Sequence, residues 1–216
     1  MDPFFQPIKV SLIVSITALL IVTVFGTGIA WLMEKKNFRG KLLLDILFMM
    51  PIALPPTVIG FLLIMCFGTN GILGQAIQQI FQQSLMFTVT AAIIAAGIVA
   101  FPLMYQSVRT GISQVKKDVE DAARVDGASE RLVFSKVTLP LAKQSLFTGM
   151  ILSFTRALGE FGATLMFAGN IPGKTQTVPM AIYVAFESGR MPLAWSWVVS
   201  IIVVSSLMIF FVRKTA

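Results

Sequence analysis

The chain has 216 residues, of which 56% are hydrophobic and only 12% are charged, and its mean hydropathy is +0.84. So few charges cannot cover the surface of a soluble globule, so the composition indicates an integral membrane protein, most simply one domain over residues 1–216. The net charge is +7, but the basic residues lie in short clusters between apolar runs, as membrane topology requires. The composition therefore disfavours nucleic-acid binding.

Side chains that could carry chemistry are scarce. The chain has no His and a single cysteine, Cys66, so an internal disulfide is impossible and a metal site built from His and Cys is excluded. We expect Cys66 to be a small buried hydrophobe. The carboxylates are few and scattered, and no Ser stands beside an identifiable base. The sequence therefore predicts no enzyme activity, no cofactor and no metal.

Five stretches are apolar and long enough to cross a bilayer, which takes about 20 residues for each helix. The predicted spans are residues 10–33, 42–67, 85–108, 140–167 and 191–212. The predicted fold is an all-α membrane bundle of five transmembrane helices. The first apolar run is much longer than the core of a signal peptide and lacks a basic region before it, so we expect it to remain in the mature protein.

The charges between the spans predict the orientation of the chain. Residues 34–41 hold four basic residues, more follow between 109 and 136, and Arg213 and Lys214 follow the last span. Because basic loops face the cytoplasm, these segments and the C-terminus are expected on the cytoplasmic side of the plasma membrane. The N-terminus, residues 68–84 and residues 168–190 are then expected outside.

The second span contains three prolines, Pro51, Pro55 and Pro56, within the run PIALPPTVIG. Each proline removes a backbone donor and clashes with the preceding turn, so the helix cannot continue unbroken. Freed carbonyls at membrane depth need protein or water beside them, so we expect this span to face the interior of the bundle. Two explanations remain open: a kink that serves packing, or a segment that lines or gates a pathway.

The fourth span contains the run RALGEFG, in which Arg156 and Glu160 are four residues apart. Ionisable side chains inside a membrane are costly, so they normally pair or line an aqueous path. We expect these two residues to be partners. They could form a structural ion pair, or Arg156 could add positive potential along the route of an anion.

Two other stretches are informative by what they exclude. Residues 168–175 read AGNIPGKT, which fits the loose form of a phosphate-binding loop. They follow a transmembrane helix, contain Pro172 and lie on the outer side, so they are not expected to bind nucleotide. Any ATPase must therefore be another chain. Residues 178–188 are apolar but too short to span, which favours an interfacial or re-entrant helix.

Residues 116–140 form a polar island, KKDVEDAARVDGASERLVFSKVTLP, between two apolar spans. Asp118 is a candidate N-cap of a first short helix, and Gly127 suits the left-handed position after its end. Ser129 can cap a second helix, and Pro140 can open the next one. The island therefore predicts a helix–turn–helix elbow on the membrane surface. Its apolar stripe, available to a partner, consists of Val119, Ala122 and Ala123.

This elbow resembles the cytoplasmic coupling loop of ABC-type importer permeases. That loop has the pattern Glu-Ala-Ala, three residues, Gly, nine residues, Ile, one residue, Leu-Pro, and we place it at residues 116–139. The corresponding positions here are Asp121, Ala122, Ala123, Gly127, Val137, Leu139 and Pro140, of which five match and Val137 replaces Ile. Asp121 replaces the longer acid of the pattern, and Glu120 stands next to it.

Further segments extend the resemblance over nearly the whole chain. LPPTVIGFLL in the second span and RALGEFGATLMFAGNIPGKTQTVPMAIY across the fourth are similar to the molybdate and tungstate branch of type I ABC importer permeases. The resemblance implies a homodimer in the lipid bilayer, an extracytoplasmic molybdate-binding protein, and two ABC ATPase subunits that each receive one elbow. A permease for sulfate or another small oxyanion is the alternative. A membrane scaffold or sensor that recruits a cytoplasmic partner is a third hypothesis.

Overall fold

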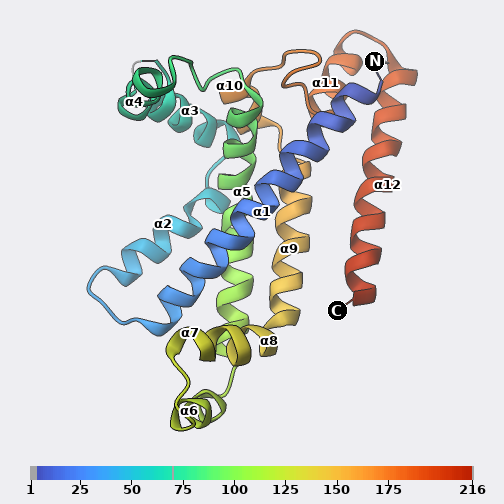
Figure 1. The fold of residues 1–216 in the computed structure, drawn as a ribbon. Helices are drawn as coiled ribbons and strands as arrows, with labels where there is room; N and C mark the ends of the chain where they lie inside the picture. Colours follow the sequence, from blue (N-terminus) through green and yellow to red (C-terminus); the bar gives the residue numbers. More distant parts are fainter. Residues whose placement is uncertain (1–3, 70, 216) are drawn as a thin grey trace.

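The computed structural model describes residues 4–69 and 71–215, and every element in this part of the chain is a helix (Figure 1). Three helices are long and apolar enough to cross a membrane: α1 (Phe5–Lys35), α5 (Val89–Ser113) and α12 (Met191–Thr215). A fourth candidate is the pair α2 (Lys41–Ala53) and α3 (Pro56–Phe67), which is bent by 119°. The all-helical prediction is confirmed, and the count of five spans stays a prediction.

The centre of the molecule is the packing of α1 on α5 and α9 (Lys143–Leu158). Figure 1 shows α1 crossing these two helices, while α12 stands at the side. Small residues permit the close approach, because alanines leave room for neighbouring backbones. Those of α5 that are completely buried are Ala91, Ala92, Ala95, Ala96 and Ala100.

The second predicted span is broken where the prolines predict a break. Leu54 and Pro55 have extended ψ angles of 143° and 139°, and α3 begins at Pro56. Pro51 lies inside α2 without ending it. The expectation that this span faces the interior is wrong for α2, which has no buried residue in a single copy of the chain. The bend directs α2 away from the bundle, so it contacts α5 along one side only (Figure 1).

The prediction that Cys66 is buried is also wrong, since its side chain is exposed. The buried face of α3 is formed by Ile59, Gly60 and Leu63. Cys66 belongs to the other face, with Met65 beside it also exposed. Apolar character in a membrane helix indicates burial from water, but it does not tell lipid from protein.

The fourth predicted span, residues 140–167, is not one helix. It consists of α8 (Leu139–Leu141), α9 and α10 (Gly162–Ala168), with a break at residues 159–161. Gly159 ends α9, and the carboxylate of Glu160 accepts a hydrogen bond of 2.8 Å from the backbone N–H of Ala163. This bond caps α10, so the local hydrogen bonding that would continue α9 is replaced by a new helix start.

Shorter helices lie at the two ends of the molecule. α4 (Ile72–Phe81) forms within residues 68–84, for which no helix was predicted, and α11 (Val178–Glu187) is the predicted short apolar helix. These two lie with the N-terminus at one end, and α6 (Lys117–Val125) and α7 (Glu130–Val133) lie at the other (Figure 1). The basic loop between α1 and α2 shares the end of α6 and α7, as its charge predicts.

Candidate functional site

The polar island folds as a helical hairpin, residues 117–138, whose turn is set by Gly127. Gly127 has a φ of +87°, in the left-handed region that glycine adopts without strain. Its N–H donates to the carbonyl of Arg124 at 3.0 Å, and the N–H of Ala128 donates to the carbonyl of Ala123 at 3.1 Å. These two bonds are those of a Schellman motif, which satisfies the carbonyls at the end of α6. The predicted left-handed glycine is confirmed.

The remaining cap predictions have mixed outcomes. Ser129 caps α7, since its hydroxyl accepts a hydrogen bond from the N–H of Leu132 at 3.4 Å. Asp118 is not the N-cap of α6: the helix begins at Lys117, so Asp118 already lies in the first turn, where its charge favours the helix dipole. Pro140 stands in the first turn of α8, as expected, but α8 has three residues, and the long helix α9 begins at Lys143.

Arg124 holds the two helices of the hairpin together. Its Nε and Nη2 atoms donate to the two carboxylate oxygens of Glu130 at 2.6 and 3.2 Å, and its Nη1 pairs with Asp121. Such a fork-shaped contact fixes orientation as well as distance. The Arg124 guanidinium also holds the pKa of the Glu130 carboxyl below its usual range. Asp121 itself is mostly exposed, so it belongs to the surface of the hairpin.

Glu120 joins the hairpin to the end of α1. This residue is 3% exposed. Its Oε1 atom accepts a hydrogen bond of 2.5 Å from the hydroxyl of Thr138, and its Oε2 atom pairs with the ammonium of Lys35, the last residue of α1. Burial raises the pKa of Glu120, but the hydrogen bonds from Lys35 and Thr138, with the charges of Lys35 and Arg124, outweigh it and lower the pKa.

An aromatic contact reinforces this junction. The rings of Trp31 on α1 and Phe134 after α7 have centroids 4.7 Å apart. Phe134 opens a π-helical turn, η1 (Phe134–Thr138), which ends at Thr138, the partner of Glu120. The sequence pattern points to Glu120 only as a neighbour of Asp121. The structure makes Glu120 the buried acid of the hairpin and Asp121 an exposed one.

A second polar cluster connects α2 to α5 at the same end. Arg109 and the hydroxyl of Tyr105 both donate to Asp45 Oδ1, at 2.5 and 2.7 Å. Arg109 Nε also lies 3.5 Å from a carboxylate oxygen of Glu34 on α1. Asp45 and Arg109 are 64 positions apart, so no local pattern indicates their pairing. The cluster, together with the packing of Phe48 on the rings of Phe101 and Tyr105, attaches α2 although it has no buried residue.

The broken helices meet at one place. A Cβ atom added to Gly162 would lie 3.0 Å from Cβ of Pro56, and one added to Gly60 would lie 3.1 Å from Cα of Ala163. The backbones of α3 and α10 therefore cross in direct contact, and the break between α2 and α3 adjoins the break between α9 and α10. The structure thus brings the second and fourth predicted spans together at Pro56 and Gly162.

Arg156 and Glu160 are partners, as the sequence predicts. Nη1 of Arg156 donates to Oε2 of Glu160 at 2.7 Å, and Glu160 is 2% exposed. The other oxygen of Glu160 holds the start of α10, so this anion occupies the N-terminus of the helix itself. The pair therefore stabilises the break. That Arg156, Glu160, Pro51, Pro55 and Pro56 line or gate a pathway stays a prediction.

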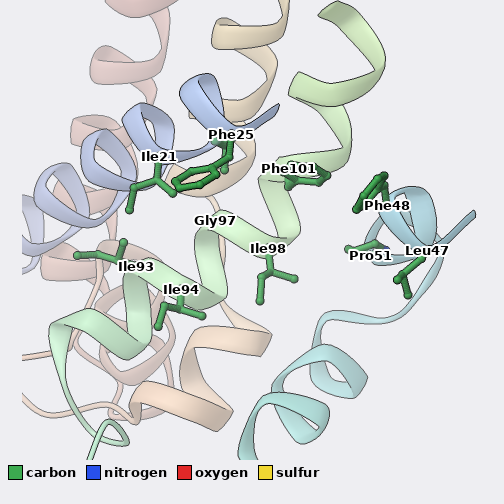
Figure 2. A pocket seen from close by; sticks show the side chains of 11 residues that line it. Ile21, Phe25, Leu47, Phe48, Pro51, Ile93, Ile94, Gly97, Ile98 and Phe101 are labelled. Carbon is green, nitrogen blue, oxygen red and sulfur yellow. The ribbon is translucent and has the colours of Figure 1, made fainter. Parts of the chain in front are cut away.

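Pro51 lines an apolar cavity of about 340 Å³ between α1, α2 and α5. Figure 2 shows Pro51, Leu47 and Phe48 on α2 across a gap from Ile98 and Phe101 on α5, with Phe25 of α1 on the α5 side of the gap. All side chains around this cavity are apolar, so it offers no hydrogen bond to an anion. Within the described residues, no three His, Cys, Asp or Glu side chains gather as metal ligands would.

Comparison with known proteins gives the class of the chain. Residues 23–214 match the model of the family "Binding-protein-dependent transport system inner membrane component", and the chain belongs to this family. It is therefore a membrane component of a transport system rather than an enzyme, and it is a multi-pass protein of the inner membrane.

Individual relatives narrow the class. The chain is 54% identical to YvgM of Bacillus subtilis (strain 168), a protein named for a molybdenum transport system, over 98% of this chain and 93% of YvgM. It is 40% identical to "Molybdenum transport system permease protein ModB" of Escherichia coli (strain K12), over 87% of this chain and 82% of ModB. Among solved structures, a chain of a bacterial ABC transporter involved in alginate import is similar to this one, with a TM-score of 0.77 and 14% sequence identity. The similarity covers 100% of this chain and 79% of that chain, so the two share the fold.

Proposed function

We propose that the chain is the permease subunit of an ABC importer that moves molybdate or tungstate into the cytoplasm, powered by ATP hydrolysis on a separate subunit. Membership of the transport family and the molybdenum names of the two relatives support this substrate class. The observation that carries the mechanism is the hairpin, which is rigid inside, fixed to α1 and open to a partner on its other face.

The rigidity follows from contacts already described. The Schellman turn at Gly127 and the fork between Arg124 and Glu130 make α6 and α7 one body. The buried carboxylate of Glu120 then fixes this body to Lys35 at the end of α1. A force on the hairpin is thereby transmitted to α1, which packs along α5 and α9. A rigid element of this kind can make one nucleotide state of a partner favour one membrane conformation.

The open face of the hairpin is apolar although it lies in the most charged part of the chain. Val119 and Val125 are 44% and 87% exposed, and Ala122 between them is exposed as well. These residues are three apart, so they share one face of α6. Exposed apolar residues with a polar rim mark a surface for a protein partner. We infer that this face enters a cleft on the ABC ATPase, with Gly127, Leu139 and Pro140 completing the coupling loop.

The assembly follows from the same proposal. Two copies of the chain, each with five spans, enclose the pathway; each copy binds one ATPase subunit, and a molybdate-binding protein delivers the anion at the outer face. The hairpin and the C-terminus face the cytoplasm and the N-terminus faces outward. Binding of ATP brings the two hairpins together and opens the pathway outward, and hydrolysis resets it.

Reconstitution tests this proposal. The chain is purified with its ABC ATPase and binding protein, placed in vesicles with ATP inside, and supplied with radiolabelled molybdate, with and without excess sulfate. We expect ATP-dependent molybdate uptake that sulfate reduces little. Uptake of sulfate in preference to molybdate would instead identify the permease of another oxyanion. Failure to associate with any ATPase would overturn the transporter proposal and favour a scaffold or sensor.

A further inference from the structure

A groove of about 410 Å³ lies between α5 and α9, near the hairpin end of both helices. All its lining side chains are polar and uncharged. Gln106, Thr110 and Gln114 come from α5 and its C-cap, and Gln144 and Thr148 come from α9. Successive members are four residues apart, so each set forms one face of its helix. The groove is therefore a polar strip built by two helices.

Within the part of the chain that the structure describes, the side-chain amides of this groove have no hydrogen-bond partner. The side chains of Gln106, Gln114 and Gln144 are exposed, and they make no hydrogen bond to any other residue that the structure describes. An amide that faces hydrocarbon without a partner loses the hydrogen bonds that it makes in water, which is strongly unfavourable. Because α5 is long and apolar enough to span a membrane, this face requires water, a polar ligand or the second copy of the chain rather than lipid.

Small residues form the base of the groove. A Cβ atom on Gly111 would lie 2.4 Å from Cβ of Ser145, and one on Gly149 would lie 3.0 Å from Cβ of Ser107. The two helices are therefore in close contact at these levels, with the serines between them. The longer amide side chains line the same groove, and the close small-residue packing recurs at two levels along it.

A second cavity of about 360 Å³ continues the strip toward the hairpin. It shares Gln114, Gln144 and Ser145 with the groove and ends at Lys116 and Val119. Lys116 is the one charged residue among the described residues that line either cavity, and no carboxylate lines them. The sign of the charge at this mouth favours anions over cations.

The chemistry of the strip suits a tetrahedral oxyanion. Such an anion only accepts hydrogen bonds, which side-chain amides and hydroxyls donate. Neutral donors bind it less strongly than a charged donor does, so they permit release. Arg156 already pairs with Glu160, and the cavity at Pro51 is apolar. We propose that the strip between α5 and α9 is the inner part of the anion route, where amide and hydroxyl groups, without a cationic side chain, bind a tetrahedral oxyanion.

This inference rests on the proposed transport function, and thiol labelling tests the two separately. Cys66 is the only cysteine, so Cys66→Ser gives a cysteine-free chain in the assembled complex. Molybdate uptake by the native chain and by this variant is measured first. Absence of uptake by the native chain would overturn the transport function, whereas uptake together with unreactive cysteines in the strip would overturn only the present inference.

Single cysteines are then introduced into this variant at Thr110 or Thr148. Each is treated from the hairpin side with a thiol-reactive methanethiosulfonate that carries a negatively charged sulfonate group. We expect both to react, and excess molybdate to slow the reaction at least threefold. Val24→Cys on α1, which is 71% exposed and apolar in setting, should not react. Asn37→Cys, in the exposed loop after α1, should react without protection. Unreactive strip cysteines, or cysteines that react without protection as Asn37→Cys does, would overturn the inference.

A charge substitution gives an independent readout. Gln144→Glu keeps the shape of the side chain and adds a negative charge in the strip, so we expect uptake about tenfold lower through repulsion of the anion. Gln144→Asn keeps a neutral amide but shortens it, so we expect its uptake to fall less than that of Gln144→Glu. Gel filtration of each assembled complex confirms that the variants fold and associate. Equal uptake by the two assembled variants would contradict the proposal.

Discussion

Two buried glutamates, Glu120 in the hairpin and Glu160 at the break of α9, are held in different ways. The hydrogen-bond partners of Glu120 lie 85 and 18 positions away along the chain, at Lys35 and Thr138, and the local Arg124 adds only a looser ion pair at 3.6 Å. Those of Glu160 lie within four positions, at Arg156 and the N–H of Ala163. The first acid therefore fixes one body of the protein against another, whereas the second fixes the shape of one helical break.

The difference matters for how movement passes through the molecule. A contact between distant elements can transmit displacement from the hairpin to α1, while a local contact keeps two half-helices at a set angle. The break at Glu160 adjoins the break at Pro56, so the two breaks form one irregular region at the crossing of α3 and α10. We therefore expect changes in the hairpin to affect coupling, and changes at Glu160 to affect local order.

The largest effect is expected at the turn of the hairpin. Gly127→Val should abolish molybdate uptake and leave membrane insertion intact, because a β-branched residue resists a φ of +87°. An added Cβ would meet no atom within 4 Å, so the effect comes from the backbone alone. Gly127→Asn is the matched control, since Asn tolerates the left-handed region. Unaltered uptake in the Val variant would count against the hairpin as the coupling element.

Removing the charge of Glu120 should have the next largest effect. Glu120→Gln keeps the shape of the side chain but loses the ion pair with Lys35, so the hairpin should become less stable by about 2 kcal/mol. Hydrogen exchange of α6 and η1 in the complex measures this, together with a severalfold loss of uptake. The control is Asp121→Asn, which changes the exposed neighbouring acid. Equal effects of the two variants would show that burial of Glu120 is not what matters.

Double-mutant cycles sharpen the comparison. The cycle of Arg156→Gln with Glu160→Gln compares free energies of unfolding. The coupling free energy between the two residues should be about 1 kcal/mol, because Arg156 is nearly one-third exposed. Gln at 160 can still accept the hydrogen bond from Ala163. The cycle of Lys35→Met with Glu120→Gln should give a larger coupling free energy. The comparison fails if the local pair proves to be the stronger one.

The smallest effect is expected from acid. The folded pKa of Glu120 lies below its ordinary value of 4.5, so its stabilising contribution is fully present above that pH and is lost as the pH falls through the folded pKa. The difference in melting temperature between the wild type and Glu120→Gln should therefore be constant above pH 4.5 and shrink below it. A difference that grows on acidification would contradict the pairing with Lys35 and Thr138.

Several features of the molecule could be predicted from local signals in the sequence. Hydropathy indicates helices in a membrane, prolines predict the break before α3, and Gly127 with Ser129 predicts the hairpin turn. The spacing of Arg156 and Glu160 predicts their pairing. Each of these properties depends on a residue and its neighbours within about one helical turn, which is why periodicity and backbone preference suffice.

Other features depend on which surfaces meet, and only the tertiary structure decided them. Glu120 and Asp121 are adjacent acids, yet one faces Lys35 and the other faces solvent. The attachment of α2 by Asp45 and the polar strip between α5 and α9 each require side chains from segments far apart in the sequence. The sequence by itself determined where the chain is helical, apolar and bent. The tertiary structure decided which charges are buried and which polar faces line a cavity, because ion pairing and burial depend on the packing of distant helices rather than on local backbone preference.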